Sequence, residues 1–176
     1  FDNFPWSSNK NHLKKWKEGK TGYPIVDAAM RQMYEIGWMH NRLRMVSGSF
    51  LVKHLRINWI EGEKYFKDSL LDYDTANNVS GWQWIAGCGA DAAPYFRIFN
   101  PMTQGEKFDP NGTFVKKWVP ELNALPKKFI HKPWELPNEE AYKINFNLKR
   151  DYYEPIVNHV EARQAALNAF EHTKNK

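Results

Sequence analysis

The stretch Gly37-Trp38-Met39-His40-Asn41-Arg42-Leu43-Arg44-Met45 carries the strongest structural signal in the chain. It reads as a helix, and helical spacing places five residues on one face: Trp38, Asn41, Arg42, Met45 and Ser49. Trp and Met are unusual on a solvated helix, whereas Asn and Arg are unusual on a helix buried in a core. The mixture predicts one wall of a cavity for a flat, partly charged ligand.

Helical patterns flank this stretch on both sides. Pro24 is a favourable first-turn residue, apolar residues follow it at helical spacing, and Gly37 ends the pattern. Further helices are expected over five ranges: 39–55, 61–71, 76–85 with Thr75 as its cap, 114–122 and 155–172. The Pro- and Gly-rich segment 91–112 is expected to be loop-rich, and 123–153 is expected to be mostly coil. Because no alternating pattern indicates a strand, the predicted fold class is all-α with long ordered loops.

Composition bounds the class of protein. The 176 residues suit one domain, and a net charge of +5 suits either a polyanionic partner such as DNA or a merely basic protein. The single Cys88 cannot form an internal disulfide, which fits a reducing compartment. The longest apolar run is too short to span a membrane. The six histidines lack the spacing of a zinc site, so no metal is expected.

The Asp72-Tyr73-Asp74 segment is the second notable feature. Its two carboxylates precede a predicted helix, where they could simply favour the helix dipole. Alternatively, one carboxylate pairs with Arg44, which lies on a different side of its helix from Asn41, and the other accepts hydrogen bonds from the N–H edge of a ligand. Both interpretations stay open on the residues alone.

The helix after this segment carries a polar and aromatic stripe. Asp74, Asn78 and Trp82 recur every four residues, so they share one face. Asn is mildly unfavourable inside a helix, so Asn78 is expected to have a side-chain partner. Trp82 and Trp84 point in neighbouring but distinct directions, and core packing is the simpler explanation for either indole taken alone.

Together these motifs resemble the C-terminal FAD-binding helical domain of the photolyase/cryptochrome family. Five blocks carry the resemblance in the family's order and spacing: 21–31, 37–45, 72–78, 81–84 and 96–101. The resemblance is strong over residues 6 to about 122 and weaker over the last helix. It implies that residues 1–176 form the C-terminal part of that domain and bind folded FAD. The N-terminal α/β antenna domain and the upstream part of the helical domain would lie outside the chain, so the isolated piece is expected to bind FAD weakly and to be inactive.

The resemblance also implies roles for single residues. The implied FAD contacts are Arg44, Asp72, Tyr73, Asp74, Asn78 and Asn41. Within this set Arg44 would pair with Asp72, and Asn78 would face the flavin N5. The implied electron-transfer chain is Trp82, Trp59 and Trp6. The implied catalytic residues are Asn78, Met45 and Trp84. The implied DNA-binding residues are Trp38, Asn41, Arg42, Met45, Trp84, Arg97 and Gln104.

Asn78 also indicates the subtype within the family. Plant-type cryptochromes resemble this pattern with Asp at that place, and insect-type ones carry Cys. Enzymes for six-four photoproducts have histidines where this chain has its Asn41 and Met45 pattern. The implied function is therefore light-driven repair of cyclobutane pyrimidine dimers in damaged DNA by a lyase in a bacterial cytoplasm, with no protein partner. The alternatives are a cryptochrome-type blue-light sensor or, for the isolated chain, a helical DNA-binding module without a cofactor.

Overall fold

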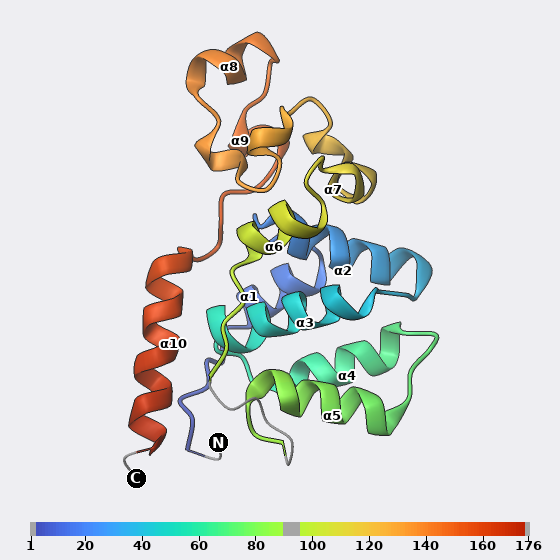
Figure 1. The fold of residues 1–176 in the computed structure, drawn as a ribbon, viewed down its shortest axis with the longest axis vertical. Helices are drawn as coiled ribbons and strands as arrows, with labels where there is room; N and C mark the ends of the chain where they lie inside the picture. The colour runs from blue at the N-terminus through green and yellow to red at the C-terminus, as the bar shows by residue number, and fades with distance from the viewer. Residues whose placement is uncertain (1–2, 90–95, 175–176) are drawn as a thin grey trace.

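The computed structural model describes residues 3–89 and 96–174. Within these ranges all regular secondary structure is helical, which confirms the predicted all-α class (Figure 1). The core is formed by α2 (Pro24–Ile36), α3 (Asn41–Ser49), α4 (Trp59–Ser69) and α5 (Thr75–Ala86), with α1 (Lys10–Lys17) packed against α2. Helix α3 packs against both α2 and α5, and α4 lies along α5. This arrangement places α3 and α5 face to face around the site described below.

Helix α2 has the limits that its sequence predicts. Pro24 occupies its first turn, and Gly37 ends it in the left-handed conformation with φ +66. The Gly37 carbonyl accepts a hydrogen bond from the Leu71 backbone N–H at 2.9 Å. A Cβ at Gly37 would collide with the Leu71 side chain. Glycine is therefore needed here both for its φ angle and to seat the segment that leads to Asp72.

Helix α3 is shorter than predicted. It begins at Asn41 because the His40 ring Nδ1 accepts the Arg42 backbone N–H at 3.1 Å and so caps the helix. Trp38 therefore precedes the helix and is not part of its face. At the other end the predicted α-helix to Leu55 is wrong, because residues Phe50–His54 form a π-helix, η1. A π-helical turn is rare and is often found at functional sites.

The residue that caps the start of α5 is not the predicted one. Asp74, rather than Thr75, is the cap, since its Oδ1 accepts the Asn77 backbone N–H at 2.8 Å. Gly87 ends the helix in the left-handed conformation, as its place in the sequence predicts. Helix α4 begins two residues earlier than predicted, where the Asn58 side chain accepts the Ile60 backbone N–H at 3.0 Å.

The prediction of a loop-rich segment over 91–112 holds at 96–100 and 109–112 but is wrong at 101–108, which is helical. Residues 91–95 lie outside the described ranges, and α6 (Pro101–Phe108) follows. Pro101 starts this helix, and the Asn100 side chain caps it, so the proline that was interpreted as a helix breaker is a helix initiator. The helix predicted over 114–122 is split into α7 (Thr113–Trp118) and the 3₁₀ turn η2 (Pro120–Leu122), with Pro120 at the junction.

The region predicted as a loop over 123–153 consists of short turns and helices. It contains the 3₁₀ turns η3 (Lys127–Phe129) and η4 (Pro133–Glu135), then α8 (Asn138–Lys143) and α9 (Leu148–Asp151), at the far end of the molecule from α4 and α5 (Figure 1). The last helix, α10 (His159–Lys174), does not begin at Pro155. It begins after Asn158, whose Oδ1 accepts the backbone N–H groups of Val160 and Glu161.

The segment between α9 and α10 is tied to α2 by one buried carboxylate, that of Asp27. Asp27 is fully buried and accepts hydrogen bonds from the backbone and hydroxyl of Thr21 at 2.8 and 2.6 Å and from the Gly22 N–H at 3.0 Å. The Tyr152 hydroxyl donates a fourth bond at 2.5 Å across 125 residues of sequence. Burial raises the pKa of Asp27, while these hydrogen bonds act in the opposite direction. Within the block 21–31, Asp27 therefore has a structural role, because it joins α2 to the segment that contains Tyr152.

Candidate cofactor pocket

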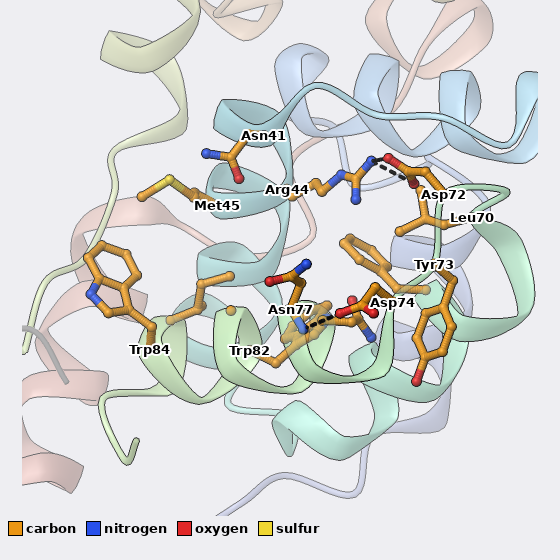
Figure 2. Close-up of a pocket in the computed structure, with 14 residues that line it drawn as sticks. Asn41, Arg44, Met45, Leu70, Asp72, Tyr73, Asp74, Asn77, Trp82 and Trp84 are labelled. Carbon is orange, nitrogen blue, oxygen red and sulfur yellow. Dashed lines mark hydrogen bonds and ion pairs between the residues drawn. The ribbon is translucent and has the colours of Figure 1, made fainter. Parts of the chain in front are cut away.

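A cavity of about 390 Å³ lies between α3, α5 and the segment that joins α4 to α5 (Figure 2). Nine predicted site residues line it: Asn41, Arg44, Met45, Asp72, Tyr73, Asp74, Asn78, Trp82 and Trp84. Five further lining residues were not predicted: Phe66, Leu70, Asn77, Gly81 and Ile85. The cavity wall predicted from the Gly37–Met45 stretch is therefore present, with Asn41, Arg44 and Met45 as its contribution.

An ion pair lies at one edge of the cavity. The Arg44 Nη2 donates to both carboxylate oxygens of Asp72, at 2.9 and 2.7 Å, and its Nε donates to the Met39 carbonyl at 2.7 Å. The sequence suggested this pairing as one of two possibilities, and the structure shows it. The guanidinium is held between two acceptors, so its plane is fixed at the cavity edge. The Asp72 side chain remains 47% exposed.

Asn78 is oriented by a glutamate that sequence reasoning missed. Its Nδ2 donates to the Glu63 Oε1 and to the Glu63 carbonyl, both at 3.3 Å. The Tyr73 hydroxyl donates to the same Oε1 at 3.0 Å. An ionised carboxylate only accepts, so the amide NH₂ of Asn78 must face Glu63 and its oxygen remains an acceptor for another group. Asn78 therefore has the side-chain partner that its place inside a helix predicts.

Beneath the cavity lies a closed aromatic cluster. Trp82 is 2% exposed, and its ring meets Phe66 edge to face at 4.9 Å and Trp16 at 6.2 Å. The Trp16 indole N–H donates to the Ser47 carbonyl at 3.0 Å, which satisfies its polar atom. Gly62 of α4 lies against the Trp82 ring, and a Cβ there would overlap it. The absence of a side chain at residue 62 makes room for the indole.

The two ends of the cavity differ in character. Figure 2 shows Met45 and Trp84 at one end, with Asn41 above them, and Asp72, Tyr73 and Asp74 at the other. The Asn77 carboxamide points into the space between these ends. One end can hold an apolar planar group, and the other can accept hydrogen bonds from N–H groups.

The remaining predicted DNA-binding residues lie outside the cavity lining. Trp38 is 44% exposed beside the start of α3. The Arg42 guanidinium lies 5.0 Å from the Phe108 ring centre, and the exposed Arg97 lies 4.7 Å from that of Phe99. Gln104 of α6 has a buried Oε1 with no hydrogen-bond partner among the described residues. These positions neither establish nor contradict a role in DNA binding, which stays a prediction.

The predicted electron-transfer residues lie at different depths. Trp82 is in the buried cluster, whereas Trp59, the first residue of α4, and Trp6, in the N-terminal segment, are half-buried and pack against the core. The Trp6 ring also lies 4.5 Å from that of Phe4. Passage from a buried indole to more exposed ones is compatible with a relay, but the order Trp82, Trp59, Trp6 stays a prediction.

The polar groups of the cavity suit part of an FAD molecule. The Asp74 carboxylate and the Asn78 oxygen can accept ring N–H groups. The lining carries one cation, Arg44, and two carboxylates, Asp72 and Asp74, so its net charge is −1. Asp72 already engages Arg44. The residues therefore fit the flavin, while a pyrophosphate would need cations from outside this lining.

Among the described residues, no group of three or more His, Cys, Asp or Glu side chains is arranged to hold a metal ion. Within the same ranges no helix combines the length and the apolar character needed to cross a bilayer.

The family described as the FAD binding domain of DNA photolyase matches residues 1–172. The chain belongs to this family. The deoxyribodipyrimidine photo-lyase of Escherichia coli is 58% identical over 170 residues, which cover 97% of this chain and 35% of that protein. The deoxyribodipyrimidine photo-lyase of Neurospora crassa is 46% identical over 177 residues, covering 97% of this chain and 28% of that protein. This chain of the FAD-binding family thus spans about a third of the length of its relatives.

Two solved structures support the same assignment. A class III photolyase from Agrobacterium tumefaciens superposes with a TM-score of 0.96 at 52% identity, covering 100% of this chain and 36% of that protein. A cryptochrome from Synechocystis superposes with a TM-score of 0.90 at 41% identity, covering 95% of this chain and 34% of that one. The helical FAD-binding fold predicted from the sequence is therefore confirmed, and both functional branches share it.

Proposed function

We propose that the protein carrying this chain repairs cyclobutane pyrimidine dimers in DNA, using light and bound FAD, as a deoxyribodipyrimidine photolyase. The observation that supports this most directly is the cavity. Its lining includes Asn78, the Arg44–Asp72 pair, Met45 and Trp84. The names of the relatives support the same activity. The chemistry that bound, reduced FAD would supply under light is the loan of one electron to the cyclobutane ring, which would return after the ring splits, so that no net redox change results.

The polar end of the cavity holds and orients the flavin in this proposal. The Asn78 oxygen would be free to accept a hydrogen bond from flavin N5 when that atom carries a proton, because the amide NH₂ donates to Glu63. Arg44, which is paired with Asp72, would lie at the flavin side of the cavity, and Tyr73 stabilises the Asn78 orientation through Glu63. Asp74 would accept a further hydrogen bond from the cofactor, and Asn41 would accept or donate one.

The apolar end receives the damaged bases. A stacked dimer inside a duplex cannot reach a cavity, so the lesion must be flipped out, and a poorly paired lesion costs less to extrude. Met45, Trp84 and Trp38 pack on the flipped dimer, and Asn41 and Arg42 contact it from the DNA side. Arg97 and Gln104 contact the flanking backbone, where arginine gives a salt-dependent affinity independent of sequence. The +5 net charge suits this partner.

The tryptophans have a separate task. We assign the chain Trp82, Trp59 and Trp6 to light-driven reduction of oxidised flavin and not to repair. Trp82 is the buried member, which suits the place nearest the cofactor. A variant in this chain should therefore repair normally when its flavin is reduced beforehand.

The test uses the full-length protein with chemically reduced flavin and thymine-dimer DNA under near-ultraviolet light, followed by restoration of thymine absorbance. Repair should be lost in Asn78→Asp and Trp84→Ala and retained in the matched tryptophan variant Trp59→Phe. Normal flavin photoreduction without repair in the wild-type protein would instead assign the cryptochrome function, which the similarity to the Synechocystis structure keeps as the second candidate.

The isolated chain provides a separate test of the cofactor assignment. The net charge of −1 in the cavity lining predicts that this chain alone binds FAD weakly or not at all, because the pyrophosphate lacks cations there. The measurement is flavin absorbance after purification. A stoichiometric amount of flavin on residues 1–176 would show that this charge argument is wrong.

A further inference from the structure

Lys53 is a fully buried lysine for which the proposed repair mechanism has no use. It lies in the π-helix η1, directly after α3, and is 1% exposed. Lysine is almost never fully buried unless its amine is paired, because a buried charge is costly. Burial lowers the pKa of the Lys53 amine to about 7, against a smaller opposite effect from Cys88. Such a costly placement calls for a specific contact at the amine.

That contact is with the backbone beside a predicted DNA-binding arginine. The Lys53 Nζ donates to the Arg97 carbonyl at 3.1 Å and lies 3.8 Å from the centre of the Phe96 ring. The opposite neighbour of Phe96 is Phe170 of α10, stacked at 4.2 Å. Phe96 is therefore held between the Lys53 amine and α10, which runs beside the core (Figure 1).

A second anchor lies two residues further along. The Ser49 hydroxyl, at the end of α3, accepts the Phe99 backbone N–H at 3.3 Å. Segment 96–99 is thus fastened to one continuous helical stretch by Lys53 and Ser49, four residues apart. Although its carbonyl is one of the anchored groups, Arg97 has an exposed side chain, with its guanidinium beside the Phe99 ring. The backbone is fixed while the charged side chain is presented outward.

We propose that Lys53 is a positioning residue that holds segment 96–99 on η1, so that Arg97 meets the DNA backbone in one orientation. The DNA part of this inference rests on the proposed repair function. Lysine suits the task because its long stem reaches from inside the core to a carbonyl, and its amine also lies against a ring face. A segment ordered before binding loses less entropy on contact with DNA, which strengthens that contact.

The experiment compares variants of the full-length protein. Lys53→Met keeps the length and apolar stem but removes the donor, whereas Lys53→Arg keeps a donor. Arg97→Ala removes the presented side chain, and Lys143→Met, on the exposed lysine of α8, is the matched control. Two quantities are measured: affinity for dimer-containing DNA at several salt concentrations, and the rate of tryptic cleavage between Arg97 and Ile98.

We expect Lys53→Met to raise the cleavage rate severalfold and to lower the salt dependence of binding by about 0.9 in log–log slope, the value for one phosphate contact. Arg97→Ala should lower the slope equally, and the double variant should bind no more weakly than Arg97→Ala. Lys53→Arg and Lys143→Met should resemble the wild type. Rescue by arginine separates the loss of a donor from general loosening of the core.

Three results would overturn the inference. They are an unchanged cleavage rate in Lys53→Met, affinity losses that add in the double variant, or an unchanged affinity in Arg97→Ala while the wild type repairs dimers. In the third case the proposed repair function still stands. If the wild type neither binds nor repairs dimer DNA, the proposed function itself is wrong. The cleavage rate then decides whether Lys53 holds the segment.

Discussion

Two acidic motifs of this chain occupy opposite environments. Asp27, in the joint between α2 and Tyr152, is fully buried and accepts hydrogen bonds from three neighbouring groups and a distant hydroxyl. Asp72, at the cavity edge, is paired with Arg44 but remains 47% exposed. Both belong to blocks that carried the family resemblance. The Asp27 carboxylate uses its acceptor positions within the protein and stabilises the fold, whereas the exposed Asp72 carboxylate can still accept a hydrogen bond from a ligand. A motif's presence in the sequence does not by itself show which of the two roles it has.

The largest expected effect on stability comes from substituting the buried Asp27. Asp27→Asn keeps the shape but replaces an acceptor oxygen with an NH₂ group, which faces the donors on Gly22 or Tyr152. Leaving buried donors unsatisfied should cost about 3 kcal/mol of unfolding free energy. Asp72→Asn, at the exposed pair, should cost less than about 1 kcal/mol. Urea unfolding of the two full-length variants measures the difference, and equal losses would refute the distinction.

The next prediction tests the packing of the aromatic cluster beneath the cavity, where the Trp82 ring lies against Gly62. Gly62→Ala puts a methyl group into the space occupied by the Trp82 ring, and we expect a loss of about 1–3 kcal/mol together with slower flavin photoreduction. Gly81→Ala is the matched control for stability, because its Cβ would meet no atom within 4 Å and helical alanine is favoured over glycine. Thermal unfolding measures both variants, and the photoreduction rate is measured for Gly62→Ala. Tolerance of Gly62→Ala with unchanged photoreduction would contradict the packing argument.

A pH-dependent effect concerns Lys53. Its pKa is lowered from 10.5 to about 7 by burial, so between these values the unfolded chain binds more protons than the folded one. Stability should therefore rise with pH from about 7 to 10.5 through this group. The Lys53→Met protein lacks this contribution, so the stability difference between wild type and variant should shift in favour of the wild type over that range. Urea midpoints at several pH values test it, and a constant difference would show that the pKa is not lowered.

Local sequence signals predicted much of the fold and of the site. Gly37 and Pro24 set the ends of α2, because their backbone requirements act within one or two residues. Helical spacing placed five of the nine predicted cavity residues on shared faces: Asn41 with Met45, and Asp74 with Asn78 and Trp82. The other four, Arg44, Asp72, Tyr73 and Trp84, were expected from the possible Arg44–Asp72 pair and from the family resemblance. Local rules failed where the same residue type can either end or begin a helix. Pro101 was interpreted as a helix breaker, but it starts α6. Trp38 was predicted to lie on a helix, but His40 caps α3 and the helix begins only at Asn41.

Other features depended on contacts between distant segments. Glu63 contacts Asn78 only because α4 and α5 lie side by side, and no spacing rule links residues 15 positions apart on two helices. Asn77 was overlooked because its neighbour matched the family pattern, yet its carboxamide points into the cavity. Lys53 would be assigned to the surface by its charge, and only the packing of segment 96–99 and α10 shows why it is buried.

The substitution Arg44→Lys should have the smallest effect on stability, and it tests most directly whether the exposed Asp72 has a role in ligand binding. Lysine keeps the charge but cannot contact the Met39 carbonyl and both Asp72 oxygens in one plane. Because the pair is partly exposed, the loss of unfolding free energy should stay within about 1 kcal/mol. Flavin content of the purified full-length protein should nevertheless fall, since Asp72 would no longer be held at the cavity edge. A large loss of stability with normal flavin content would place Arg44 and Asp72 with Asp27, as fold-stabilising residues, and would remove the contrast between the two motifs.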